Sequence, residues 1–198
     1  MSALQPPRWN EARIASAIAR QVLLRKCVVL VDRCNWTGYE ADLLCVTQDL
    51  RLIDIEIKIS RGDFAQDAKK DKWWHRNING SYVETPAGRH WKWGEPVHRD
   101  WPPKIWKHYF AMPADIWDDA LFEKAPSPRS GVLLLSHGGT DSGVTVKVIR
   151  RATPNRDAGK VSAAAAIDIA RLANLRMWNA YMQTLQAGRD HIESEQEQ

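Results

Sequence analysis

The clearest pattern in the chain is a strict alternation of apolar and polar residues over residues 53–60, within a strand predicted over 52–60. Isoleucine occupies every second position, and the positions between are polar: Asp54, Glu56, Lys58 and Ser60. Successive side chains of a β-strand point to opposite faces of its sheet. The alternation therefore predicts a strand with one apolar face and one polar face.

Around this strand, apolar residues at helical or strand spacing predict further elements of both types. Helices are expected at residues 10–24, 63–72, 114–123 and 160–187, and strands at 27–31, 41–47, 107–112, 131–137 and 144–150. Asn10 can cap the first helix, and Ser60 or Asp63 the second. A turn over 138–141 is expected to join the last two strands as a hairpin. This order predicts an α/β fold in which helices flank a mixed central sheet.

Residues 73–106 break the pattern, because no helical or strand period persists there. Turn residues recur instead, as at Asn79-Gly80 and Pro102-Pro103. A segment of this length inside a domain is typical of an inserted functional loop or a small subdomain. With 198 residues the chain is too short for two full-sized domains. We therefore expect one domain over 1–187, with this insertion, and a polar tail over 188–198.

The composition adds two unusual features, ten tryptophans and a net charge of +4. Six of the tryptophans lie within residues 73–106. The three cysteines lack the C-x-x-C spacing of a metal site and form an odd set, which predicts free thiols in a reducing compartment. No run approaches the ~18 apolar residues of a membrane-spanning helix. We expect a soluble, cytoplasmic protein without membrane contact.

Asp42 and Glu56 are the first candidates for chemistry. Asp42 precedes the alternating strand, and a hairpin turning at Gln48-Asp49 would set it beside Glu56. Two carboxylates from adjacent strands form an oxygen-rich site that suits Mg²⁺. Such an ion neutralises charge on a phosphate under attack and lowers the pKa of a bound water. Lys58, on the same face as Glu56, would add a positive charge.

Two alternatives stay open from the residues alone. Asp42 could share a metal ion with Asp54 instead of Glu56. A strand with Asp, Glu and Lys on a solvated face is also common, and its Glu-x-Lys ion pair would then contribute little.

The motif formed by Asp42 and residues 54–58, Asp-Ile-Glu-Ile-Lys, resembles that of the PD-(D/E)xK phosphodiesterase superfamily. Residues 56–69 are similar to the E-I-K-x-S-R-x-D-F-x-x-D-x-K stretch of MmcB-type DNA-repair proteins. Residues 108–113 and 131–149 resemble the strand and the closing hairpin that follow in that group. The similarity spans roughly residues 10–150.

This resemblance implies a restriction-endonuclease-like core and metal-dependent cleavage of nucleic acid. It carries catalytic roles onto Asp42, Glu56 and Lys58, with the two carboxylates as metal ligands and the acid Glu11 as a possible fourth site residue. The sequence departs from the family at Tyr39-Glu40-Ala41, where the family has basic residues. It also departs in the insertion, which separates the lysine-rich helix from the strand that follows. The first departure bears on local DNA contacts and the second on the choice of substrate.

Basic and aromatic residues predict where a nucleic acid would bind. Residues 58–107 hold eleven Lys or Arg against six Asp or Glu, and aromatic faces among cations suit unpaired or distorted nucleic acid. The candidate contacts are Arg61, Lys69, Lys70, Lys72, Trp73, Trp74, Arg76, Arg89 and Lys92. Alternatively, the tryptophans form a small core that folds the insertion, and the lysines lie on a solvated helix face.

The sequence thus predicts a Mg²⁺- or Mn²⁺-dependent deoxyribonuclease. It would hydrolyse DNA phosphodiester bonds in repair, recombination or phage-type DNA processing, with a homodimer as one possible assembly. Two other functions compete with this one: a catalytically silent nucleic-acid-binding protein with a nuclease fold, and a protein-docking module that uses the tryptophan-rich insertion.

Overall fold

The computed structural model describes residues 9–138 and 143–196, without the side chains of residues 76–78 and 189–196. In this part of the chain six strands form one mixed sheet, in the order β1-β2-β3-β6-β7-β8. Their bounds are β1 (Cys27–Cys34), β2 (Ala41–Thr47), β3 (Leu52–Ile57), β6 (Lys107–Pro113), β7 (Gly131–His137) and β8 (Val144–Arg150). β6 is parallel to both β3 and β7, and the other neighbouring pairs are antiparallel.

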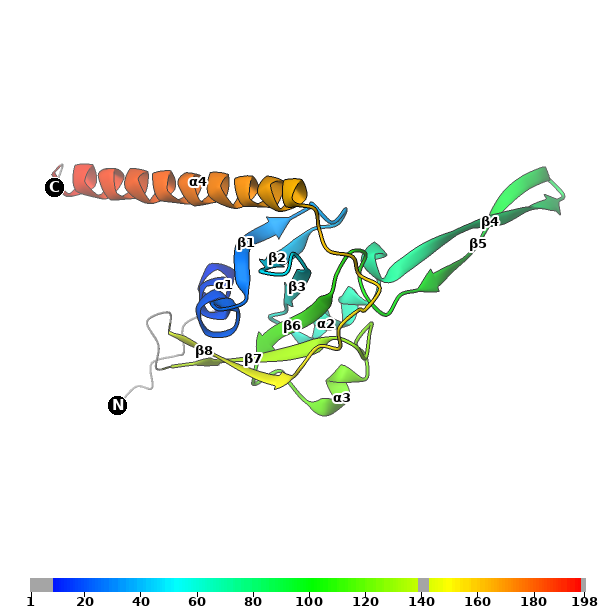
Figure 1. Cartoon of the computed structure of the whole chain (residues 1–198), viewed down its shortest axis with the longest axis horizontal. Coiled ribbons are helices and arrows are strands. Elements are labelled where there is room, and N and C mark those ends of the chain that lie inside the picture. Colours follow the sequence, from blue (N-terminus) through cyan, green and yellow to red (C-terminus); the bar gives the residue numbers. More distant parts are fainter. Residues whose placement is uncertain (1–8, 139–142, 197–198) are drawn as a thin grey trace.

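Helices flank this sheet on both faces (Figure 1), as the sequence predicts. Their bounds are α1 (Glu11–Ile18), its π-helical continuation η1 (Ala19–Leu23), α2 (Arg61–Asp67), the 3-10 turn η2 (Asp71–Trp73), α3 (Asp119–Phe122) and α4 (Ala163–Gln196). α1 packs on the face that carries Ile53 and Ile55. α2 and α3 pack against the opposite face through Phe64 and Leu121, and Ile169 of α4 lies in the cluster that includes Leu52.

The predicted caps hold, but several element bounds differ from the prediction. Asn10 accepts a hydrogen bond from the Arg13 N–H at 3.2 Å, and Ser60 accepts one from the Asp63 N–H at 3.1 Å. The helix expected over 114–123 is reduced to the short α3, which Asp118 caps. α4 runs to Gln196, so most of the predicted tail is helical. The expected turn over 138–141 lies largely outside the described residues.

β3 is buried on both faces, which excludes the alternative of a strand with a solvated polar face. Its isoleucines share one face, as predicted, and lie in the cluster that includes residues of α1. On the other face Asp54 and Glu56 have no exposed surface, because α2, η2 and β6 lie close to them. The alternation of residue type was correctly interpreted as a strand, but it marks a buried polar cluster and not a wet surface.

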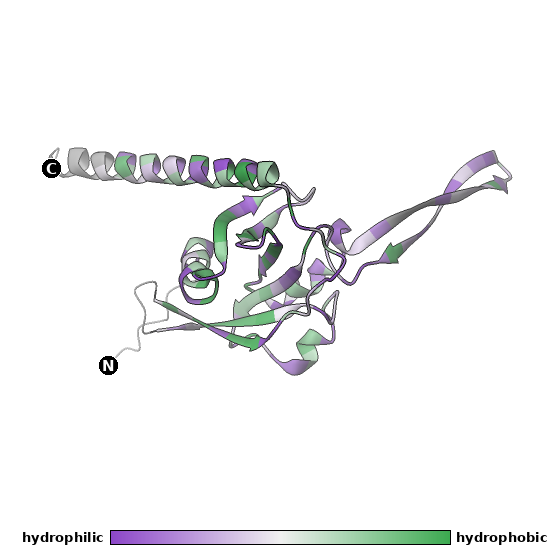
Figure 2. Cartoon of the chain, viewed as in Figure 1, coloured by the Kyte–Doolittle hydropathy of each residue, from purple (hydrophilic) through white to green (hydrophobic). Residues whose placement is uncertain are grey.

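The insertion forms a long antiparallel hairpin of β4 (Trp74–Thr85) and β5 (Gly88–His98). This hairpin, called the arm below, projects from the body (Figure 1) and is mostly hydrophilic in colour, whereas the central strands are largely hydrophobic (Figure 2). The predicted small tryptophan core does not form among the described residues. Trp73 and Trp106 pack into the body, while Trp91 and Trp93 are exposed on the arm.

No helix in the described part of the chain combines the length and the apolar character needed to cross a membrane.

Candidate functional site

The candidate site lies where β2 begins and β3 ends. The antiparallel register pairs Leu43 with Ile55, so the next step along both strands places Asp42 opposite Glu56 on the same face. The Asp42 Oδ2 atom accepts a hydrogen bond from the Ile57 N–H at 2.7 Å. The structure therefore brings together the two carboxylates that the sequence predicts as neighbours.

Three lysines surround the Glu56 carboxylate. The Lys72 Nζ lies 2.5 Å from Oε1, and the Nζ atoms of Lys70 and Lys58 lie 2.7 and 3.2 Å from Oε2. Burial opposes the charge on Glu56, but the three ammonium groups, led by Lys72, outweigh burial and lower the pKa of this carboxyl. Glu56 is therefore ionised and is surrounded by three lysine ammonium groups, called the lysine cage below.

Asp67, at the end of α2, is a second buried acid that the sequence analysis missed. Asp67 has no exposed surface, so it does not belong to the solvated helix face that the alternative interpretation of this segment describes. Its Oδ1 lies 2.8 Å from the Lys58 Nζ and 3.1 Å from the Lys70 Nζ, and Trp73 donates its indole N–H to Oδ2 at 2.9 Å. The nearby lysines hold the pKa of Asp67 below its usual range despite burial.

Asp54 extends the cluster towards β6. Its Oδ2 accepts a hydrogen bond from the Tyr39 hydroxyl at 3.0 Å and lies 3.5 Å from the Lys72 Nζ. Its Oδ1 is buried and has no hydrogen-bond partner among the described residues. Burial raises the pKa of Asp54 to about 7, and the Lys72 ammonium offsets only part of that effect. Asp54 is thus the carboxyl of this cluster that is poised to hold a proton near neutral pH.

His108 of β6 closes the same end of the cluster. It pairs with Asp54 across the parallel strands β3 and β6. Its Nε2 lies 3.4 Å from the Lys72 Nζ, and its Nδ1 lies 2.9 Å from the Ser130 hydroxyl oxygen. Burial, together with the Lys72 charge, holds the pKa of His108 well below its usual value, so the imidazole is neutral.

A cavity of about 130 Å³ opens beside Asp42 and is also lined by Glu11 of α1, Asp32 of β1 and Ile57. The structure therefore places Glu11 at the same end of the sheet as Asp42. Burial and the neighbouring Glu56 charge raise the pKa of Asp42 to about 6.

The carboxylate oxygens at this site are suitable ligands for a hard divalent cation, but their present arrangement does not form a metal site. Asp42 and Glu56 offer carboxylate oxygens of the kind that Mg²⁺ and Mn²⁺ prefer. Among the described residues, however, no three His, Cys, Asp or Glu side chains are grouped as metal ligands. Lysine ammonium groups contact both oxygens of Glu56. A cation that binds there must displace Lys70 first, because this side chain is 44% exposed while Lys58 and Lys72 are buried.

The predicted nucleic-acid contacts fall into two groups. Lys72 and Trp73 are buried, so in this structure they serve the interior and not a DNA surface. The other seven lie on α2, after it or on the arm: Arg61, Lys69, Lys70, Trp74, Arg76, Arg89 and Lys92. Their described side chains are exposed, and the side chain of Arg76 lies outside the described residues. Arg61 is already paired with Asp118 at 3.0 Å.

Comparison with known proteins adds little to this geometry. No protein-family model matches the sequence, and no curated protein matches it significantly. One solved structure is similar, that of a protein of unknown function from Silicibacter pomeroyi, with 20% sequence identity and a TM-score of 0.49. The similarity covers 94% of this chain and 93% of that one. The α/β architecture with a mixed, helix-flanked sheet therefore rests on the structure itself.

Proposed function

We propose that this protein is a metal-dependent nuclease with a restriction-endonuclease-like core that hydrolyses DNA phosphodiester bonds. One observation carries the proposal: Asp42 from β2, Glu56 from β3 and Lys58 directly after β3 converge at one end of the sheet. The helix, the antiparallel strands β1 to β3 and the parallel strand β6 that frame them support the proposed core. DNA repair, recombination or phage-type DNA processing is the proposed context.

In this proposal Asp42 and Glu56 hold Mg²⁺ or Mn²⁺, with Glu11 as an additional acid beside Asp42. When bound, such an ion would neutralise charge on the phosphate and would lower the pKa of a water molecule. Lys70 reaches solvent and contacts the phosphate under attack, where its charge offsets the negative charge that develops in the transition state. Lys58 keeps Glu56 in place, and Asp67 retains Lys70 beside the site after the cation has displaced it from Glu56.

A cleavage assay with isosteric variants tests the proposal. Labelled single-stranded, duplex and branched DNA are incubated with Mn²⁺ and the wild-type protein, Asp42→Asn, Glu56→Gln or the control Glu40→Gln. Glu40 is exposed and lies two residues from Asp42. We expect the site variants to cut at least about a hundredfold more slowly and the control to cut normally. Thermal unfolding of each variant shows whether a lost activity reflects a lost fold.

Two results would overturn the nuclease: no cleavage of any of these DNAs by the wild-type protein, or equal rates for the wild type and both site variants.

A second candidate is favoured by the lysine cage. Three ammonium groups already neutralise Glu56, so the cluster can be a structural network that carries a nucleic-acid-binding surface without catalysis. In that case the wild-type protein binds DNA, with an affinity that falls as salt rises, and cleaves none of it.

A further inference from the structure

The arm carries a row of aromatic side chains on one of its faces. Tyr82 of β4 is paired with Trp91 of β5, and paired residues point to the same face of a sheet. Arg89 and Trp93 lie two residues from Trp91 in either direction, which puts them on that face as well. We call these four residues, Arg89, Tyr82, Trp91 and Trp93, the arm stripe.

Neighbouring members of the arm stripe contact one another. The Arg89 guanidinium lies 4.4 Å from the centre of the Tyr82 ring. The Tyr82 and Trp91 ring centres are 5.0 Å apart, and those of Trp91 and Trp93 are 5.9 Å apart. Gly80 allows this packing, because a Cβ atom there would lie 2.5 Å from the Trp91 ring. The row is therefore a built surface and not a chance scatter of side chains.

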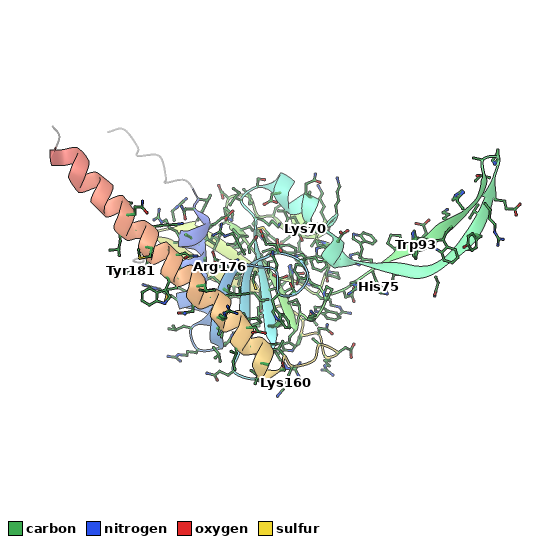
Figure 3. All side chains as sticks on the ribbon, turned by 90° about the horizontal axis from the view of Figure 1, so that it is seen from above. Lys70, His75, Trp93, Lys160, Arg176 and Tyr181 are labelled. Carbon is green, nitrogen blue, oxygen red and sulfur yellow. The ribbon has the colours of Figure 1, made fainter. Side chains whose placement is uncertain are left out.

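The arm stripe has no protein core beneath it. Trp93 is 65% exposed, Tyr82 59% and Trp91 41%. The arm projects away from the sheet, and Trp93 lies on it well away from Lys70 (Figures 1 and 3). An isolated two-stranded hairpin is only marginally stable in water. Exposed rings on such an element point to a ligand that covers them.

We propose that the arm stripe binds single-stranded DNA by stacking unpaired bases on its rings. Aromatic rings and a guanidinium plane form the kind of surface that nucleic-acid-binding proteins offer to bases. The arm with its adjoining residue, 74–99, carries four Lys or Arg against two Glu. This excess of positive charge favours a negatively charged polymer over a basic or a purely apolar partner. In a duplex the base faces are already stacked, so the arm stripe selects unpaired strands.

The position of the arm in the chain links the arm stripe to the candidate site. β4 begins at Trp74, two residues after Lys72 contacts Glu56. A strand bound along the arm is therefore led towards Lys70 and Glu56. The inference rests on the proposed function only in taking DNA as the ligand, and it makes a single-stranded segment part of the substrate.

A binding experiment without cleavage tests the arm stripe. Fluorescence anisotropy measures the affinity for a labelled oligonucleotide of roughly 20 nucleotides, in EDTA and at low salt, with an unlabelled duplex as competitor. Trp93→Ala should weaken single-strand binding about tenfold, the cost of one lost stacking contact, and Trp93→Phe should restore most of it. His90→Ala is the matched control, because His90 lies between Arg89 and Trp91 but on the opposite face.

Three results would overturn the inference. They are no binding of the oligonucleotide, the same affinity for Trp93→Ala as for His90→Ala, and a duplex that competes as well as the single strand. EDTA keeps this test separate from the nuclease. Arm-dependent binding by a protein that never cuts DNA would retain the arm stripe and reject the proposed nuclease. Normal cleavage, together with binding that does not depend on the arm, would retain the proposed nuclease and reject the arm stripe.

Discussion

At the scale of single residues, the most unusual feature is a buried cluster in which lysines and carboxylates neutralise one another. Lys58 and Lys72 are buried with Glu56, Asp54 and Asp67. Charges are costly to bury unless they are paired at short distance, and removal of one partner leaves another unpaired. The cluster is also sensitive to pH, because the folded protein raises the pKa of Asp54 and lowers the pKa values of Glu56 and Asp67.

Asp54 gives a pH prediction for the metal-free protein. Its pKa in the folded protein is about 7, above the ordinary aspartate value of 3.8, so the folded state holds this proton more tightly than the unfolded state. The contribution of Asp54 to stability is therefore present at low pH and lost as the pH rises from about 4 to about 7. Asp54→Asn resembles the protonated form, so its free energy of unfolding, relative to wild type, should increase across this range in urea titrations with EDTA.

The control for this prediction is Asp49→Asn. The Thr47 hydroxyl donates to the exposed Asp49 carboxylate and lowers its pKa. This substitution removes a contribution that is present only above the ordinary pKa of an aspartate, so its relative stability should shift in the opposite direction as the pH rises. A relative stability of Asp54→Asn that stays constant or falls between pH 4 and 8 would contradict the assignment.

At the scale of elements, the tryptophans of the insertion have two different roles. Trp73, in η2, has no exposed surface and packs with Phe64 and Phe110 under the sheet, with its indole N–H on Asp67. Trp93, on β5, is mostly exposed. The insertion is therefore anchored by its ends, while the arm between them contributes little to the packing of the body.

Substitution of these two tryptophans compares how much the anchored end of the insertion and the arm each contribute to the stability of the protein. Trp73→Ala should lower the free energy of unfolding by about 3–5 kcal/mol, because it leaves a cavity and removes the hydrogen bond to the buried Asp67 Oδ2 atom. Trp93→Ala should change it by less than about 0.5 kcal/mol. Urea unfolding followed by circular dichroism measures both. A comparable loss for the two variants would mean that the arm packs on the body in solution.

At the scale of the whole molecule, the body carries two extensions, the arm and α4, which project in different directions (Figure 1). α4 contacts the body near its start, where Ile169 is buried and Arg176 reaches Asp32 at 3.3 Å. Further along, apolar residues at spacings of three and four are exposed: Leu175, Trp178, Met182 and Leu185. This spacing is that of a two-helix seam.

We propose that a second copy of the chain covers this seam, so that the homodimer forms through α4. Antiparallel pairing centred on residues 175–185 lays the four apolar positions of one copy against the same four positions of the other. Sedimentation equilibrium should show a wild-type dimer, and Trp178→Glu combined with Met182→Glu should give a monomer.

Gln183→Glu is the control for the dimer, because it adds a charge to the same helix outside the seam and should leave the dimer intact. A wild-type protein that is monomeric at tens of micromolar, roughly the range in which weak homodimers form, would contradict the pairing.

Local patterns in the sequence predicted the local features of this protein. Period-two and helical spacing located the central strands, the caps at Asn10 and Ser60 held, and the spacing across one hairpin placed Asp42 beside Glu56. These features depend on residues close in the chain, where side-chain direction and hydrogen bonding follow directly from the backbone. The length of α4 and the hairpin form of the insertion escaped this reasoning, because polar and aromatic residues in exposed elements leave no hydrophobic period.

Only the tertiary structure decided what surrounds Glu56. Lys70, Lys72 and Asp67 come from α2 and the turns after it, and His108 lies 54 positions after Asp54, its partner in the parallel register of β3 and β6. A parallel pairing across an insertion leaves no signal in spacing, so the sequence left open a solvated polar face, and the fold buries that face. The sequence determined which charged groups the protein possesses. Packing of distant elements determined that these groups neutralise one another, and that the rings of the arm do not reach the core.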